Sequence, residues 1–208
     1  MEFIKHPELR GKHALLAPSQ PHWLRYSEEQ LYQKYTSKYA QDIGTYLHEL
    51  AETLIKNRVK LKKTDKNVVI VHLLGKGIPA NVIDIDRIYN NFMLYVNDAV
   101  GFRLTPEVVL KYSDYCFGTA DAINFDKNIL RIHDYKSGTV PAKMEQLMTY
   151  AALFCLEYKV KPGEIKIVLV IYQGDEPVQH EPEADEILPV MDTIVRHSRY
   201  LETVNEEV

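Results

Sequence analysis

The stretch PEVVLKYSDYCFGTADAINFDKNILRIHDYKS, residues 106–137, decides the fold of this chain. It divides into three short runs rich in β-branched and aromatic residues, at 106–113, 115–125 and 128–137. The connections, SD after the first run and DKN after the second, have the chemistry of hairpin turns. Because short turns join strands that pair antiparallel, the stretch predicts a three-stranded antiparallel meander.

The segments that follow the meander predict a helix, one more strand and a last helix. Residues 141–159 (PAKMEQLMTYAALFCLEYK) favour a helix, with Pro141 suited to its first turn. EIKIVLVIYQG at 164–174 is a β-branched run that predicts a buried strand. A loop followed by a C-terminal helix is expected to account for 183–206.

The segments that precede the meander are mainly helical. From Ile43 to about Lys60, apolar residues recur at helical spacing and give one stripe: Ile43, Leu47, Leu50 and Leu54. A short polar helix is expected before it, in SEEQLYQKYTSKYA, and a further helix at 81–99 follows a surface turn at 61–67. The order of elements predicts an α/β fold whose mixed central sheet, the meander plus a further strand, is flanked by helices.

Length and composition indicate one globular domain. Its 208 residues suit a single well-buried core, with a helical lead-in at 1–40, a core at 44–172 and a C-terminal helix at 183–206. Hydrophobic residues make up 46% and charged residues 26%, a balance that argues against wholesale disorder. No stretch approaches the roughly 18 apolar residues of a membrane span, and the N-terminus lacks the apolar core of a signal peptide.

Charge and cysteine content narrow the classes of function. The net charge of −4 disfavours nucleic-acid binding overall, although residues 56–66 are locally basic. That basic cluster either touches phosphates or is a solvated turn. Cys116 and Cys155 are too few for a disulfide framework or an iron–sulfur cluster. We therefore expect a reducing, cytoplasmic location and no membrane association.

Three polar motifs lie in sequence on the predicted strands and helix: GTAD at 118–121, DYKS at 134–137 and QLMTY at 146–150. Asp134 and Lys136 are two apart on a strand, so their side chains point to the same face, near the strand that carries Asp121. Two carboxylates of this kind suit Mg²⁺ or Mn²⁺, and a neighbouring lysine can orient or deprotonate water or stabilise charge developing on phosphorus. The alternative is a cross-strand salt bridge on a solvated sheet face.

With a fourth motif, GTYLHELAE at 44–52, the set resembles the RecB-like branch of the PD-(D/E)XK nucleases, which includes the lambda-exonuclease-type enzymes. That branch has a helix with a His, a G-x-x-D strand, a (D/E)-x-K strand preceded by apolar residues, and a Q-x-x-x-Y helix. All four stand here in that order, within about 44–172. The resemblance implies a restriction-endonuclease-like core and metal-dependent hydrolysis of DNA.

The resemblance also implies a role for each residue of these motifs. Asp121 and Asp134 would be metal ligands, with the Tyr135 carbonyl as a third protein oxygen and His48 completing a metal position from its helix. Lys136 would be the catalytic lysine.

The helical motif and the end of the lysine strand would face the substrate. Gln146 would position groups on the nucleophile side or the DNA backbone, which makes it part of the catalytic set. Tyr150, one turn later, would contact DNA or brace Gln146. Ser137 would also contact the substrate.

The position of His48 on its helix can be checked independently. At about 100° per residue, His48 falls on the margin of the apolar stripe, with Glu52 next to it and Glu49 pointing away. A residue on the margin can face a cleft between helix and sheet. His48 is therefore the first ligand candidate, Glu52 the second and Glu49 the third, and the alternative for His48 is a hydrogen-bonded interfacial histidine.

These observations predict a Mg²⁺- or Mn²⁺-dependent deoxyribonuclease without an iron–sulfur cluster. Because no base-reading module is evident, we expect an exonuclease that depends on DNA ends, in recombination, repair or phage DNA processing. A phage-encoded enzyme would act in the cytoplasm of a bacterial host, with a recombination or single-strand-binding protein as a possible partner. The alternatives are a structure-specific endonuclease and an inactive nuclease-fold module that binds DNA or protein.

Overall fold

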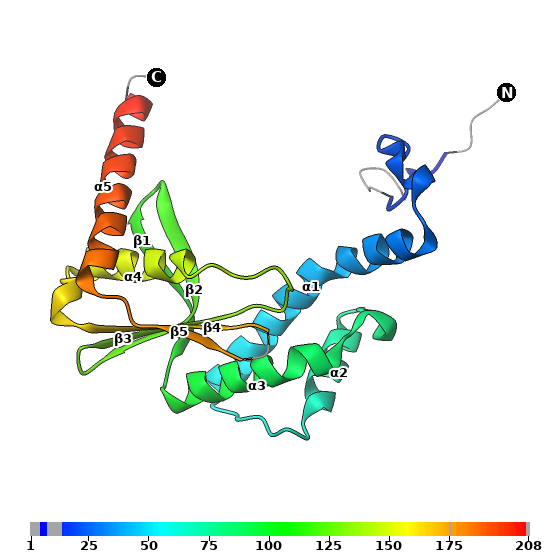
Figure 1. Cartoon of the computed structure of the whole chain (residues 1–208), viewed down its shortest axis with the longest axis horizontal. Helices are drawn as coiled ribbons and strands as arrows, with labels where there is room; N and C mark the ends of the chain where they lie inside the picture. The colour runs from blue at the N-terminus through cyan, green and yellow to red at the C-terminus, as the bar shows by residue number, and fades with distance from the viewer. Residues whose placement is uncertain (1–4, 8–13, 175, 207–208) are drawn as a thin grey trace. The chain divides into compact units, whose positions relative to one another are not determined.

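The three predicted strands form the meander, and two more strands extend it into one sheet (Figure 1). The strands are β1 (Thr105–Ser113), β2 (Cys116–Asp126), β3 (Ile129–Tyr135), β4 (Lys166–Tyr172) and β5 (Val178–His180). They lie side by side in the order β1-β2-β3-β4-β5, and only the β3–β4 pair is parallel. The predicted α/β fold with a mixed central sheet is confirmed, and β5 is an edge strand that was not predicted.

The DKN turn explains why β2 and β3 pair in a single register. Lys127 and Asn128 both have positive φ, 49° and 60°, and lie between the paired residues Asp126 and Ile129. Two central residues with φ above zero are what a two-residue hairpin loop needs to match the twist of its strands. The turn therefore sets the register that carries along β3 to Asp134.

Helices cover both faces of the sheet (Figure 1). The helices after residue 60 are α2 (Lys66–Gly75), α3 (Ile85–Gly101), α4 (Glu145–Tyr158) and α5 (Ala184–Glu206), and short 3₁₀ turns lie at Pro21–Arg25, Ala80–Val82 and Pro162–Glu164. α4 joins β3 to its parallel neighbour β4 and packs against the sheet and against α5. α3 packs against β3 and β4, with α2 beside it.

A hydrophobic cluster lies between the sheet, α4 and α5. In β3 it includes Leu130 and Ile132, and in β4 it includes Leu169 and Ile171. Since side chains alternate along a strand, Asp134 is the next residue of the Leu130–Ile132 row. The hydrophobic pattern of β3 thus explains why a carboxylate is buried, with 2% of Asp134 exposed.

The polar helix and the stripe helix, predicted as separate elements, are one helix, α1 (Glu28–Lys56). No proline interrupts this stretch, and the single Gly44 is tolerated in a long helix. The helix ends four residues before the expected Lys60, and Arg58 just beyond has a positive φ of 55°. The four stripe residues are buried as predicted.

Other boundaries differ from the sequence-based expectation. α2 was not predicted, and it begins inside the expected surface turn at 61–67. α3 begins at Ile85 instead of residue 81, because the Asp84 side chain caps the helix by accepting from the Arg87 N–H. α4 begins at Glu145, so the expected position of Pro141 in its first turn is wrong.

Pro141 lies instead in the loop from β3 to α4, and Gln173 at the end of β4 holds that loop. The Gln173 amide donates to the carbonyls of Gly138 and Val140, at 2.7 and 2.8 Å, and its oxygen accepts from the Ala142 N–H at 2.7 Å. These contacts fix the loop between Gly138 and Ala142, ahead of the first turn of α4.

The coordinates come from a computed structural model that describes residues 5–7, 14–174 and 176–206. The chain forms two compact units, one up to Asp42 and one from Ile43 onward. The second contains the sheet and all four motifs. Across the described ranges, none of the helices combines the length and the apolar character that crossing a membrane demands.

Candidate active site

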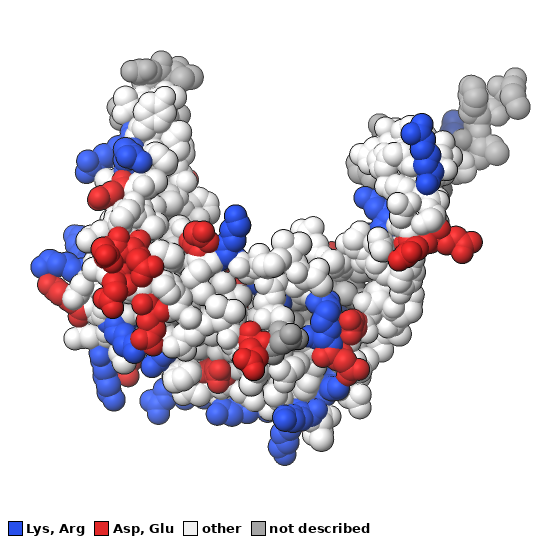
Figure 2. All heavy atoms as spheres, viewed as in Figure 1, with Lys and Arg blue, Asp and Glu red and all other residues white. Residues whose placement is uncertain are grey.

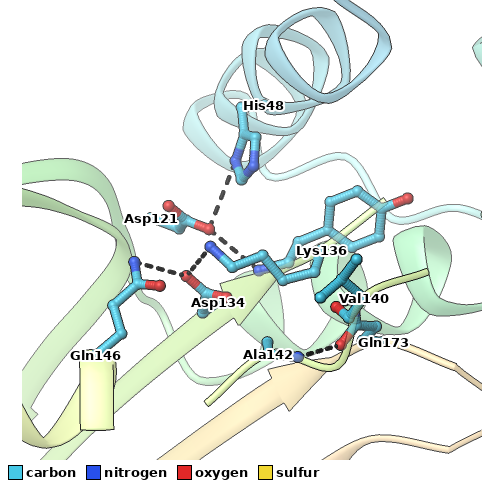
Figure 3. A network of polar contacts seen from close by, with 9 residues as sticks. His48, Asp121, Asp134, Lys136, Val140, Ala142, Gln146 and Gln173 are labelled. Atoms are coloured by element: carbon cyan, nitrogen blue, oxygen red, sulfur yellow. Dashed lines mark hydrogen bonds and ion pairs between the residues drawn. The ribbon is translucent and has the colours of Figure 1, made fainter. Parts of the chain in front are cut away.

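Asp121 and Asp134 meet where β2 and β3 stop pairing (Figure 3). The register of these strands ends at Ala122 and His133, and the two aspartates are the next residues. The Tyr135 N–H donates to Asp121 Oδ2 at 3.1 Å, and Lys136 Nζ lies 2.9 Å from Asp134 Oδ1. Asp134 and Lys136 therefore share a face, as the two-residue spacing predicts.

His48 reaches the same place from α1. Its Nδ1 lies 3.5 Å from Asp121 Oδ2, and 28% of its side chain is exposed. Burial lowers the pKa of His48, and a hydrogen bond with the main chain of Tyr135 opposes that shift. One turn earlier, a Cβ on Gly44 would lie 3.3 Å from Ser137 Oγ. The glycine of the first motif thus permits a close approach of α1 to the end of β3.

α4 supplies the Gln and Tyr of the fourth motif. Gln146 Nε2 lies 3.5 Å from Asp134 Oδ1 (Figure 3). Gln146 also hydrogen-bonds Tyr150, which acts to lower the pKa of the phenol, while burial raises it more strongly. A Cβ on Gly118 would lie 3.1 Å from the Tyr150 ring. The glycine of the G-x-x-D motif therefore makes room for the tyrosine of the Q-x-x-x-Y motif.

Glu107 on β1 joins the site, and sequence reasoning missed it. The β1–β2 register pairs Pro106 with Ala122 and Val108 with Ala120, which leaves Glu107 opposite Asp121. Ligand atoms of Glu107, Asp121 and His48 all lie within 4.8 Å of one another. Glu107 has a positive φ of 54°, rare for a non-glycine residue in a strand, and such outliers cluster at functional sites. The only sequence signal is an acidic residue after Pro106.

The two lower-ranked helix candidates point to other partners. Glu52 pairs with Lys56 one turn along α1, at 2.5 Å, and Glu49 pairs with Lys76 of the α2 end at 2.5 Å. Neither belongs to the cluster of possible metal ligands found among the described residues. Of the three candidates on α1, His48 alone enters that cluster.

Burial dominates the electrostatics of the site. It raises the pKa of Asp134 to about 7, and the neighbouring Asp121 adds to the rise while Lys136 opposes it. It also raises the pKa of Asp121 to about 6, against the hydrogen bond from the Tyr135 N–H. Burial acts to lower the pKa of Lys136, but attraction to Asp134 and Asp121 outweighs it and the pKa is raised. For His48, burial lowers the pKa and favours the neutral imidazole.

The donor set fits a hard divalent cation. Opposite ligands of an octahedral Mg²⁺ lie about 4.2 Å apart, so ligand atoms of His48, Glu107 and Asp121 within 4.8 Å need only small adjustments. Asp134 Oδ2 is buried and has no hydrogen-bond partner in the described part of the chain. A buried carboxylate oxygen without a donor is costly, and a cation would satisfy it. Carboxylates with one imidazole suit Mn²⁺ as well as Mg²⁺.

Asp134→Asn should stabilise the metal-free protein at high pH. A folded pKa near 7, against about 3.9 in an unfolded chain, means that the wild type loses stability as pH rises from about 4 to 7. Asparagine cannot ionise, so the variant should gain about 1–3 kcal/mol relative to wild type at pH 8 and little at pH 4. Urea unfolding in EDTA at both pH values measures this.

Asp192→Asn, at an exposed position of α5, is the matched control and should change stability little at either pH. A gain for Asp134→Asn that is equal at pH 4 and pH 8, or absent at pH 8, would show that burial does not raise the pKa of Asp134.

Comparison with known proteins gives a family without an assigned activity. None of the curated proteins matches this chain. Residues 13–174 match the family model described as "Protein of unknown function (DUF2800)". The match covers most of the chain and runs from before α1 to the end of β4, so it includes every residue of the site. The chain belongs to this family, DUF2800.

Proposed function

We propose that this protein is a metal-dependent deoxyribonuclease that hydrolyses phosphodiester bonds. The observation that carries the proposal is the convergence of Asp121, Asp134 and Lys136 under His48, from separate strands and a helix (Figure 3). These are the residues that the four ordered motifs single out. The fit of the ligand set to Mg²⁺ or Mn²⁺ supports the same proposal.

A purely structural salt bridge fits this geometry poorly. The alternative requires a solvated sheet face, yet Asp134 is 2% exposed. Placing the buried Asp134 and the partly buried Asp121 beside one ammonium group costs stability, because desolvation exceeds the attraction unless every oxygen has a partner. Clusters that raise carboxylate pKa values in this way are concentrated at functional sites.

The residues of the chain divide the catalytic work. Lys136, held by Asp134 at 2.9 Å, would orient the attacking water and stabilise the charge that develops on the phosphate oxygens. The water oxygen bonds to phosphorus while the bond to one sugar oxygen breaks, giving a phosphate monoester and a hydroxyl group. Gln146 would hold the water or the phosphate from the α4 side.

His48, Glu107, Asp121 and Asp134, with the Tyr135 carbonyl, would hold the divalent cation. When bound, the cation supplies Lewis acidity and lowers the pKa of water. The chain's part is to place these ligands and to keep them desolvated. Tyr150 braces Gln146 through their hydrogen bond.

Lys136→Ala should reduce the rate of cleavage of a linear DNA by about 10²–10³, because one electrostatic stabiliser is lost at the transition state. The rate is measured with Mg²⁺ or Mn²⁺ against an EDTA blank. Lys161→Ala, on a lysine 78% exposed, is the matched control and should cut like wild type. Near wild-type cutting by folded Lys136→Ala would refute the assigned role, and a wild type without metal-dependent cutting would refute the proposed activity.

Glu107→Gln should weaken Mn²⁺ binding about tenfold or more, since it removes a charged oxygen from the ligand cluster. His48→Ala should have a similar effect, whereas Glu49→Gln, on the same helix but paired with Lys76, should have little. Titration calorimetry gives the affinities independently of any cleavage. Unchanged binding in Glu107→Gln would remove that residue from the metal site.

We further propose that cleavage depends on DNA ends. On the face seen in Figure 2, acidic and basic side chains are interspersed, and acidic residues gather near the start of α5, where Asp185 and Glu186 form the first turn. Affinity for internal DNA comes from phosphate neutralisation, which a chain with a net charge of −4 supplies weakly. An end requirement would restrain the site without any reading of bases.

A covalently closed duplex should therefore be spared under conditions that degrade its linearised form. The two are compared at equal metal and salt concentrations, with loss of full-length DNA as the readout. Equal attack on both would refute end dependence and favour a structure-specific or non-specific endonuclease.

A further inference from the structure

A cavity of about 370 Å³ opens beside Lys136, at the ends of the parallel strands β3 and β4. The first turns of α3 and the turn after β3 provide its walls. Its polar lining includes Arg87, Asn90, Asn91, Lys136, Ser137 and Thr139. Ligands of open α/β sheets bind beyond the carboxyl ends of the strands, and this volume is that of a small-molecule pocket.

Arg87 brings a cation to this cavity that the catalytic residues do not engage. Its Nη1 donates to the Ser137 carbonyl at 2.6 Å, which ties the guanidinium to the residue next to Lys136. Its ion pair with Asp84 is long, at 3.5 Å, and the Asp84 side chain is 61% exposed, so solvent screens that charge. Guanidinium groups bind phosphate through paired N–H donors.

The acidic residue of the cavity does not cancel this charge. Asp86 also lines the cavity, but its Oδ1 lies 2.5 Å from Lys66 Nζ. The remaining cation, Lys136, borders both the cavity and the carboxylate pair. Because Lys136 is itself held by Asp134 at 2.9 Å, Arg87 is the group of the lining that favours an anion close to the proposed reacting phosphate.

Asn91, in the wall of this cavity, has a buried amide group with room for one more hydrogen bond. The residue is 4% exposed, its Nδ2 donates to the Gly174 carbonyl, and its Oδ1 is buried without a partner among the described residues. A buried amide oxygen left without a donor is costly and calls for an explanation. Sugar hydroxyl groups and base N–H groups are donors that accompany phosphate in a nucleotide.

We propose that this cavity binds one nucleotide of the substrate strand next to the bond that is cut. Its phosphate lies on Arg87, and a sugar or base donor reaches Asn91 Oδ1. The inference rests on the proposed nuclease function and adds where the strand lies. The phosphate is either an internal diester or the terminal phosphate of a strand end, and the two sources are separable.

The test measures oligonucleotide binding by fluorescence anisotropy in an Asp134→Asn background, which retains Lys136 and removes one acidic ligand. Adding Arg87→Gln should weaken binding about tenfold, as loss of a charge-assisted hydrogen bond does, and reduce the salt dependence by about one phosphate. Arg199→Gln, at an exposed position of α5, is the control and should change neither value.

A scan with single neutral methylphosphonates then locates the contact. Neutralising one phosphate should weaken binding about tenfold when Arg87 is present. The same methylphosphonate should cause no further loss of binding in the Arg87→Gln variant. If removal of the terminal phosphate gives this result instead, the cavity takes the strand end. The inference is overturned if folded Arg87→Gln binds as tightly as the parent protein. It is also overturned if Arg87→Gln weakens binding but the effect adds to that of every methylphosphonate.

Wild-type cleavage of the unmodified oligonucleotide is followed in parallel, so that the two proposals fail separately. If the protein cleaves DNA but the Arg87→Gln effect is independent of every phosphate, only the proposed subsite is refuted. If the Arg87→Gln effect depends on one phosphate but no cleavage occurs, the nuclease activity is refuted and the subsite is supported. A chain that neither binds nor cuts DNA overturns both.

Discussion

A buried carboxylate, Asp134, and a partly buried one, Asp121, share one ammonium group in this protein, and the rest of the site is arranged around that imbalance. Asp134 is placed in the dry interior by the apolar row of β3, and Asp121 faces it from β2. Lys136 can neutralise only one of them. The metal-free chain therefore carries a local electrostatic cost, of the kind that proteins accept at functional sites. A bound cation would relieve this cost, and that relief would strengthen the binding of the cation.

Much of the fold could be predicted because its signals are local. The DKN turn and the alternating runs on either side define the meander, and the β-branched run at 164–174 becomes β4. Part of what was missed depends on contacts between distant residues. The loop that precedes α4 is held by Gln173, about thirty residues further along the chain. α2 was not predicted because the sequence at its N-terminal end is polar and resembles a turn.

The site divides in the same way. Asp121, Asp134, Lys136, His48 and Gln146 belong to spaced motifs, and the structure brings them together. Glu107 and Arg87 belong to no motif. The register of β1 and an unusual backbone angle place Glu107 in the site. The packing of α3 near the end of β3 places Arg87 beside it. Neither backbone strain nor helix packing can be deduced from residue spacing.

The Gln173 contacts have a consequence for how the protein is made. Every motif residue precedes Ala151, yet the loop between Lys136 and Gln146 takes its shape from a side chain at the end of β4. A nascent chain that has emerged only as far as α4 carries the full set of motif residues without the clamp that spaces them. Domains generally form as units during synthesis, so the site is assembled only once β4 has joined the sheet. The motif residues are thus synthesised first, and the contacts that bring them into their final arrangement form only after Gln173 and β4 have been synthesised.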